Sequence, residues 1–230
     1  MRLLKIIRDK IARRSSTSLI NFYRKKGVKI GNGCIFRYPF TVTIDVMRPS
    51  LVSIGDNVDM NRNFSIRTHD FGHRVFVPLY GEFLSSSGKV SIGNNVYFGM
   101  NVTVLKGVTI GDNCIIGAGS IVTKSIPSNS VAVGVPCRVI STIEDYYNKR
   151  RKEWIEESIQ YARSIKERFN REPTVKDFLP EFGLYVDSHN IKDYDQEQIK
   201  KRLGSKYDFW LKNHKAVFNG FDDFIKNIEK

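Results

Sequence analysis

Apolar residues recur at every sixth position along much of the chain. From residue 90 to residue 122 each hexad carries two inward candidates separated by one residue, as in Val90 with Ile92 and Val96 with Phe98. An α-helix has 3.6 residues per turn and cannot keep a six-residue pattern on one face, and a long strand would alternate without a break. The pattern therefore predicts very short strands, each with two inward side chains, joined by tight turns.

Three such strands close a triangular coil of about eighteen residues, and stacked coils bury a continuous column of side chains. The turns agree with this geometry. Gly, Asn and Asp tolerate the positive φ of tight turns, and they occur in runs such as residues 31–33 and 111–113. The earlier hexads predict further inward positions at Val28, Ile30, Cys34, Phe36, Phe40, Val42, Val52, Ile54, Val58, Met60, Phe64 and Ile66.

Two segments interrupt the hexads. The smaller lies near residues 45–50, where Arg48 takes the place of an apolar residue. The larger is residues 70–89, across which the phase of the hexads shifts. We expect an inserted loop there and not a missed coil. Loops that project from a rigid scaffold commonly carry binding groups.

The flanks of the hexad region predict helices, which gives three segments. Residues 1–26 form a basic amphipathic helix, residues 27–140 the β-helix domain with its insert, and residues 141–230 an α-helical extension. The N-terminal helix either covers the open end of the β-helix or lies on an anionic membrane. Its apolar stripe consists of Leu3, Leu4, Ile7 and Ile11, and resumes at Leu19, Phe22 and Tyr23.

The extension carries the usual signals of helix ends. Thr142 with Asp145 predicts a helix start, and Thr174 and Asp195 predict further caps. Glycines at positions 204 and 220 predict breaks. We expect this segment to pack on the β-helix or on a neighbouring subunit.

Charge and cysteine content bear on the partners of the protein and on the compartment in which it works. The net charge is +13, and residues 1–26 contribute nine Lys and Arg against the single acid Asp9. Such a segment is typical of nucleic-acid binding, of an anionic membrane contact or of a solvated helix face, and among these we expect no nucleic-acid partner. No apolar run approaches about 20 residues and none resembles a signal peptide, so we expect a cytoplasmic protein. The three cysteines contain no CxxC pair, and we expect Cys34 and Cys114 to be reduced packing residues.

Residues 92–113 (Ile-Gly-Asn-Asn-Val-Tyr-Phe-Gly-Met-Asn-Val and onward), 116–127 and 134–140 resemble the hexapeptide-repeat acyltransferases, in the sugar O-acetyltransferase branch. Galactoside, maltose and capsule-type acetyltransferases belong to that branch. The resemblance covers roughly residues 28–141. It implies a mainly β fold, a left-handed parallel β-helix, assembled as a homotrimer with active sites between subunits. The implied activity is acetyl-CoA-dependent O-acetylation of a saccharide or lipid-linked saccharide hydroxyl in surface polysaccharide biosynthesis, with peripheral membrane contact as an extension.

Acyl transfer to a hydroxyl needs a base, and histidine suits this role because its pKa lies near neutrality. The family keeps its catalytic histidine at a strand end before the loop, which His69 matches better than His73. We expect His73 and Asp45 to contact substrate.

The same resemblance implies a backbone N–H at Met100 that stabilises the oxyanion. It further implies cofactor contacts at Ala118, Thr123, Lys124 and Arg138. Ser141 stands where galactoside-type members carry a further Arg, so one phosphate contact of those relatives is absent.

Four other functions fit the sequence less well. An N-acetyltransferase of an amino sugar or an antibiotic acetyltransferase shares the fold, and a non-catalytic scaffold would not need His69 together with Lys124 and Arg138. A zinc carbonic anhydrase on this fold needs three convergent histidines. Only His69 and His73 lie on the repeat region, so we expect no metal.

Overall fold

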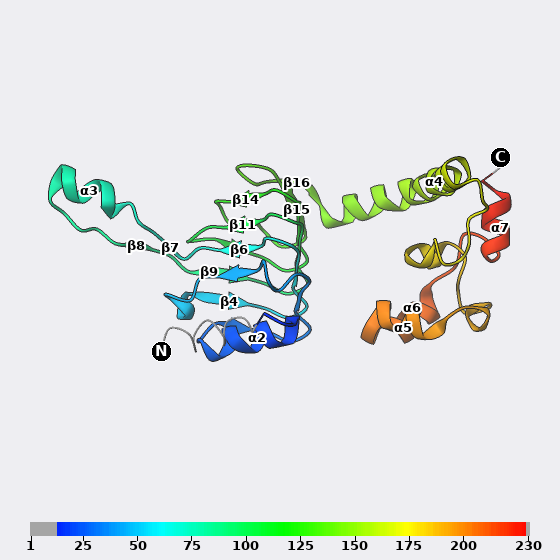
Figure 1. Cartoon of the computed structure of the whole chain (residues 1–230), viewed down its shortest axis with the longest axis horizontal. Helices are drawn as coiled ribbons and strands as arrows, with labels where there is room; N and C mark the ends of the chain where they lie inside the picture. Colours follow the sequence, from blue (N-terminus) through cyan, green and yellow to red (C-terminus); the bar gives the residue numbers. More distant parts are fainter. Residues whose placement is uncertain (1–12, 229–230) are drawn as a thin grey trace. The chain divides into compact units, whose positions relative to one another are not determined.

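Short parallel strands wind around the three faces of a column (Figure 1). The computed structural model describes residues 13–228, and the chain divides into two compact units, Met1–Tyr147 (unit 1) and Asn148–Lys230 (unit 2). Unit 1 contains the column. The prediction of a parallel β-helix from the hexads is confirmed. The apolar stripe predicted at Leu3, Leu4, Ile7 and Ile11 lies outside the described residues.

Each face of the column is one sheet. Face 1 runs in the order β1 (Lys29–Ile30), β4 (Val52–Ile54), β9 (Val90–Ile92) and β12 (Thr109–Ile110). Face 2 runs β2 (Ile35–Phe36), β5 (Asp59–Met60), β10 (Tyr97–Phe98), β13 (Ile115–Ile116), β15 (Ser130–Val133) and β16 (Arg138–Thr142). Face 3 runs β3 (Thr43–Ile44), β6 (Ser65–Ile66), β11 (Thr103–Val104) and β14 (Ile121–Val122). We call the turns from face 2 to face 3 the 2–3 corner, and those from face 3 to face 1 the 3–1 corner.

The strand register gives the length of each coil. Tyr97 pairs with Ile115, 18 positions further along the chain. Val52, in contrast, pairs with Val90, 38 positions further along. The excess of 20 equals the length of residues 70–89, so the insert leaves the column at the 3–1 corner and returns to the same corner without disturbing the stack.

The first coil is longer than the others, and this makes one sequence prediction wrong. Ile35 pairs with Asp59, 24 positions further along, which is six more than in a regular coil. Part of the excess lies in the turn between β2 and β3. The inward pair of β3 is therefore Val42 and Ile44, both buried, whereas Phe40 falls in the turn and is 68% exposed.

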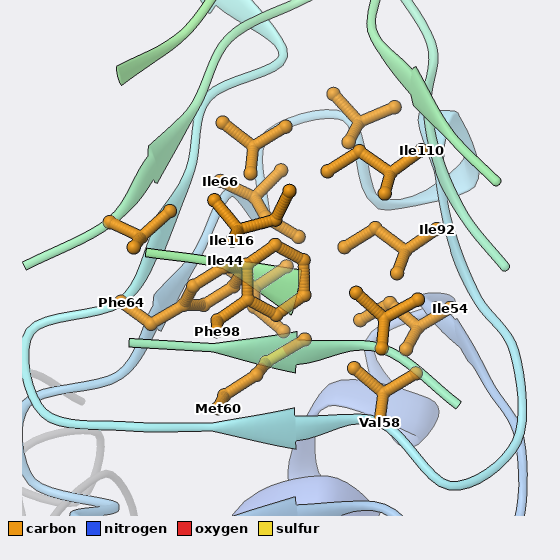
Figure 2. Packing of buried hydrophobic residues seen from close by; sticks show 14 of the residues in the cluster. Ile44, Ile54, Val58, Met60, Phe64, Ile66, Ile92, Phe98, Ile110 and Ile116 are labelled. Atoms are coloured by element: carbon orange, nitrogen blue, oxygen red, sulfur yellow. The ribbon is translucent and has the colours of Figure 1, made fainter. Parts of the chain in front are cut away.

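The column is filled by apolar side chains from all three faces (Figure 2). Phe64 and Phe98 sit in successive coils with ring centroids 4.6 Å apart. Cys114 occupies its predicted inward slot, and burial raises the pKa of its thiol. Cys34 is only half-buried, although it packs against the same core. Most inward positions predicted from the hexads are buried, because the phase is regular after the first coil.

Helix α2 (Ser16–Lys25) covers the first coil. Ser15 caps the helix, since its side chain accepts a hydrogen bond from the Ser18 amide. Leu19 and Tyr23 are buried in the core of the column. The Tyr23 hydroxyl also accepts a hydrogen bond from the Ile44 amide at 3.1 Å, which satisfies a backbone group at the end of the stack. For the described part of the N-terminal segment, the structure agrees with the capping alternative.

The insert is a ribbon that carries a helix at its tip. β7 (His69–Asp70) pairs antiparallel with β8 (Ser86–Ser87), and α3 (His73–Tyr80) lies between them in the chain. Figure 1 shows this ribbon leaving the β-helix. No residue of α3 is buried. The sequence predicted a loop here, and the apolar residues within it did not reveal the ribbon.

Unit 2 is helical and has its own core. Its elements are α4 (Ile143–Phe169), which begins just before the unit boundary, η2 (Leu179–Leu184), η3 (Ile191–Asp193), α5 (Gln196–Leu203), η4 (Gly204–Lys206), α6 (Tyr207–Asn213) and α7 (Phe221–Lys226). Asp195 caps α5 as predicted, through a hydrogen bond from the Gln198 amide. Thr174 does not cap a helix, because it bonds to Asp177 within a turn. Across residues 13–228, no helix has the length and hydropathy required to span a membrane.

The first prediction concerns the column. Phe98→Ala should lower the free energy of unfolding by about 3–5 kcal/mol, because it removes a fully buried ring. The matched control is Phe40→Ala, whose exposed ring should change it by at most about 0.5 kcal/mol. Urea unfolding followed by circular dichroism measures both. Similar losses for the two variants would show that the assignment of inward positions is wrong.

Candidate active site

His69 lies where the column and the insert meet. It follows β6 at the 3–1 corner and begins β7. Its side chain is 14% exposed, and Nδ1 lies 2.5 Å from Oδ2 of Asp45. No other hydrogen bond to the ring is present within residues 13–228. Nε2 is therefore available to a ligand.

Asp45 is held beneath the His69 ring by four hydrogen bonds. Oδ2 accepts bonds from the Thr68 hydroxyl at 2.5 Å, from the Thr68 amide and from His69, and Oδ1 accepts one from the Met47 amide. Burial alone would raise the pKa of Asp45, but the bonds from Thr68, Met47 and His69 outweigh it and leave the pKa below its usual range. Asp45 is thus a carboxylate at neutral pH.

The charge on Asp45 defines the tautomer of His69. A carboxylate only accepts hydrogen bonds, so Nδ1 must be the donor and Nε2 carries the lone pair. This is the form of histidine that can take a proton from a substrate hydroxyl. The oxygens of Asp45 are already occupied by protein groups. We therefore propose that it orients His69, in place of the substrate contact expected from the sequence.

Asp45 takes the regular position directly after β3, where its amide donates to the Ile66 carbonyl, and the extra residues of this corner come after it. Thr43 pairs with Ser65, 22 positions further along, so four residues are added at the 3–1 corner. The added segment includes the short helix η1 (Pro49–Leu51). It carries the chain outward directly after Asp45, whose side chain is 6% exposed.

His73 lies near the site but contacts neither His69 nor Asp45 directly. The ring of Phe71 stands between the two histidines, 5.2 Å from His69 and 5.8 Å from His73. His73 in turn stacks against Phe83 at 4.1 Å. Phe71 is 55% exposed beside His69, and the sequence analysis did not select it, because one exposed phenylalanine in an insert gives no recognisable pattern.

Met100 and Ala118 lie at the 2–3 corner, away from His69. They are stacked in successive coils, and the Gly119 amide donates to the Met100 carbonyl. The Met100 N–H donates no hydrogen bond within the described residues. Face 3 separates this corner from the 3–1 corner. The four steps from residue 101 to residue 105 cross that face, which at roughly 3.3 Å per step is about 13 Å. Met100 and His69 of one chain therefore cannot act on the same carbonyl group.

The predicted phosphate contacts are on the surface. Thr123 and Lys124 lie at the 3–1 corner, above His69, and both are exposed. Lys124 has no ion pair within residues 13–228, and in the same residues the guanidinium of Arg138 makes one hydrogen bond, to the Cys137 carbonyl at 2.8 Å. Both cations are thus available to an anion.

No cluster of three His, Cys, Asp or Glu side chains able to hold a metal occurs within residues 13–228.

The sequence analysis missed one further side chain. Lys106 extends from the 3–1 corner of the neighbouring coil, and its Nζ contacts Asp70 and Ser86 at the base of the insert. The Lys106 ammonium lowers the pKa of Asp70 to about 2. The sequence gave no signal for this contact, because the 20-residue insert lies between Asp70 and Lys106 and hides that they belong to neighbouring coils.

Known proteins resemble the hexad region. The family of bacterial transferases with hexapeptide repeats matches residues 89–124. Galactoside O-acetyltransferase of Escherichia coli K12 is 42% identical over 134 residues, which are 56% of this chain and 63% of that protein. Protein CapG of Staphylococcus aureus is 38% identical over 126 residues, or 55% of this chain and 72% of CapG. The solved maltose O-acetyltransferase of Clostridium difficile 630 is 31% identical with a TM-score of 0.42, covering 58% of this chain and 81% of that one.

The chain belongs to the family of bacterial transferases built from hexapeptide repeats. It spans less than two thirds of the galactoside O-acetyltransferase that it matches.

The second prediction concerns Asp45. Because its pKa is depressed in the folded state, the carboxylate stabilises the fold above its unfolded pKa of about 3.9, and this contribution is lost as the pH falls through the folded value. Asp45→Asn lacks it. The difference in unfolding free energy between wild type and Asp45→Asn should be largest at neutral pH and should decrease below about pH 4. Urea unfolding at several pH values measures it. A difference that grows on acidification below pH 4 would contradict the assigned contacts.

Proposed function

We propose that the protein is an acetyl-CoA-dependent O-acetyltransferase that acts on a saccharide hydroxyl. The observation that carries this proposal is the free Nε2 of His69, with Nδ1 held by the Asp45 carboxylate. The names of its relatives, a galactoside and a maltose O-acetyltransferase, support the reaction and the substrate class. Surface polysaccharide assembly is the setting in which we place it.

The reaction uses few protein groups. Nε2 of His69 takes the proton of the acceptor hydroxyl while the oxygen attacks the thioester carbonyl. The carbonyl oxygen becomes negatively charged, and the unbonded Met100 N–H is suited to stabilise it. The tetrahedral intermediate collapses, the C–S bond breaks, and the thiolate of CoA receives the proton from His69. Asp45 stabilises the imidazolium that exists between the two proton transfers.

The separation of the two corners supports an assembly. His69 and Met100 can serve one acetyl group only if they come from different copies of the chain. Cyclic assemblies bring one corner of a copy against another corner of its neighbour, and every copy then contributes to two sites. We propose a homotrimer with one site at each of its interfaces, as the family resemblance implies.

The exposed cations of the late coils fit the phosphates of CoA. Lys124 and Arg138 carry positive charge without a carboxylate partner in the described residues, and Thr123 adds a hydroxyl. Charge-assisted hydrogen bonds to phosphate are stronger than neutral ones. We assign Ala118 to the part of the cofactor that passes the 2–3 corner, because a small residue there leaves room for it.

The acceptor and the place of the reaction follow from the same proposal. Acetyl-CoA is a cytoplasmic metabolite, so the reaction belongs on the cytoplasmic side of the membrane. A lipid-linked saccharide would be reached there, and the basic residues 1–26 would favour an anionic surface. His73, next to the exposed Phe71, is the side chain of the insert that we assign to acceptor contact.

The third prediction tests the reaction itself. His69→Ala should lower kcat by about 10²–10⁴-fold, since a positioned base contributes that much. The variant should remain folded, because His69 is outside the core of the column and Asp45 keeps its bonds to Thr68 and Met47. Release of free thiol from acetyl-CoA, measured with a panel of saccharides, gives the rate. His73→Ala is the control and should lose much less.

Two outcomes would contradict the proposal. If His73→Ala loses the activity and His69→Ala keeps it, the base is the other histidine. If no saccharide stimulates thiol release by the wild type, the substrate class is wrong.

A further inference from the structure

One side chain of the neighbouring coil ties the insert to the column. Lys106 follows β11 at the 3–1 corner and is half-buried. Its Nζ contacts Oδ2 of Asp70 on β7 and Oγ of Ser86 on β8. It therefore bridges both strands of the ribbon at their base. Asp70 is the residue directly after His69.

The rest of the insert gives the ribbon little support. β7 and β8 share two residue pairs, His69 with Ser87 and Asp70 with Ser86. Thr68 adds one backbone bond, which its carbonyl accepts from Gly88. All side chains of α3 are at least partly exposed, so the tip of the ribbon is not packed on the column of its own chain. The direction in which β7 leaves the column thus depends on a small number of contacts at its base.

We propose that Lys106 is a positioning residue for the acetyl transfer, because it fixes the strand on which His69 lies. This inference rests on the proposed function. Asp45 orients the imidazole ring from below, and Lys106 holds the backbone of β7 from the coil above. Asp45 contacts the ring of His69 itself, whereas Lys106 contacts the side chain of the next residue, Asp70. Together they define where Nε2 meets the acceptor hydroxyl.

The ion pair between Lys106 and Asp70 does not depend on the ionisation of Asp70 at neutral pH. The pKa of Asp70 is about 2, so the carboxylate is charged above pH 3. On the acid side the contact is lost as the pH falls through that value. Any change of activity between pH 5 and 9 therefore has another origin.

Loss of the contact between Lys106 and Asp70 should lower kcat and leave the stability of the fold unchanged. The two side chains are 33% and 50% exposed, and ion pairs at such sites contribute little to stability. A misplacement of about 1 Å in a catalytic group, in contrast, can cost about 10²-fold in rate. An ordinary surface ion pair would change neither quantity, and a purely structural contact would change both together.

The fourth prediction compares Lys106→Met with Lys89→Met. Both replace a cation next to the insert by an apolar chain of similar length, but the Lys89 side chain is exposed and has no ion pair in the described residues. Lys106→Met should lower kcat about tenfold to hundredfold while the KM for acetyl-CoA and the melting temperature stay at wild-type values. Lys89→Met should behave as wild type.

A double-mutant cycle with Asp70→Asn identifies the partner. Asp70→Asn alone should lose about as much kcat as Lys106→Met, and the double variant should lose no more than either. Additive losses would overturn the proposal. So would a kcat of Lys106→Met within twofold of wild type. A raised KM for acetyl-CoA at unchanged kcat would overturn it too, since Lys106 would then be a cofactor contact.

A second measurement separates this inference from the proposed function. Amide hydrogen exchange at residues 69–72 and 85–88 needs no substrate. Exchange should be faster in Lys106→Met than in Lys89→Met, with the rest of the column unchanged. Unchanged exchange at these residues would refute the tie itself. If the wild type transfers no acetyl group but exchange responds as expected, the proposed function fails and Lys106 still holds the ribbon.

Discussion

Coil-to-coil backbone hydrogen bonding determines where each residue of the column can lie. The Tyr97 amide donates to the Cys114 carbonyl, and the same spacing recurs along all three faces. Each residue therefore has a fixed face or corner and a fixed height in the stack. Extra residues can be accommodated only at a corner, where they project outward. The 20-residue excess between Val52 and Val90 follows this rule, and the insert leaves at the corner where His69 stands.

The candidate site combines residues that the stack brings to one corner from three successive coils. Asp45 comes from the first coil, His69 from the second and Lys106 from the third. The aligned strands place these groups within reach, and the first coil supplies its carboxylate from the position directly after β3. Met100, the oxyanion donor that we propose, lies at a different corner. Under the proposed function one chain therefore holds only part of each site, and assembly of copies is a condition of activity and not only of stability.

Periodicity alone predicts most of the column, because inward slots repeat without change once the coils are regular. It fails at Phe40, since the long first coil shifts the phase and no residue in that turn marks the shift. His69 could be selected because it stands at the edge of an interruption. The role of Asp45 and the contacts of Lys106 could not, because the period shows which residues share a corner but not which side chains reach one another. In unit 2 the preference of Asp for helix N-termini predicts correctly that Asp195 caps α5. The same argument fails for Thr174, which bonds to Asp177 within a turn.

Subunit complementation tests most directly whether two copies form each site. His69→Ala removes the base, and Ala118→Trp places a bulky ring on the exposed 2–3 corner, so assemblies of either variant alone should be inactive. Coexpressed at equal amounts, the two chains would form intact sites in which His69 of one copy meets Ala118 and Met100 of another. Random mixing in a trimer predicts about a quarter of the wild-type activity. Mixed assemblies that remain as inactive as their parents would contradict a site shared between copies.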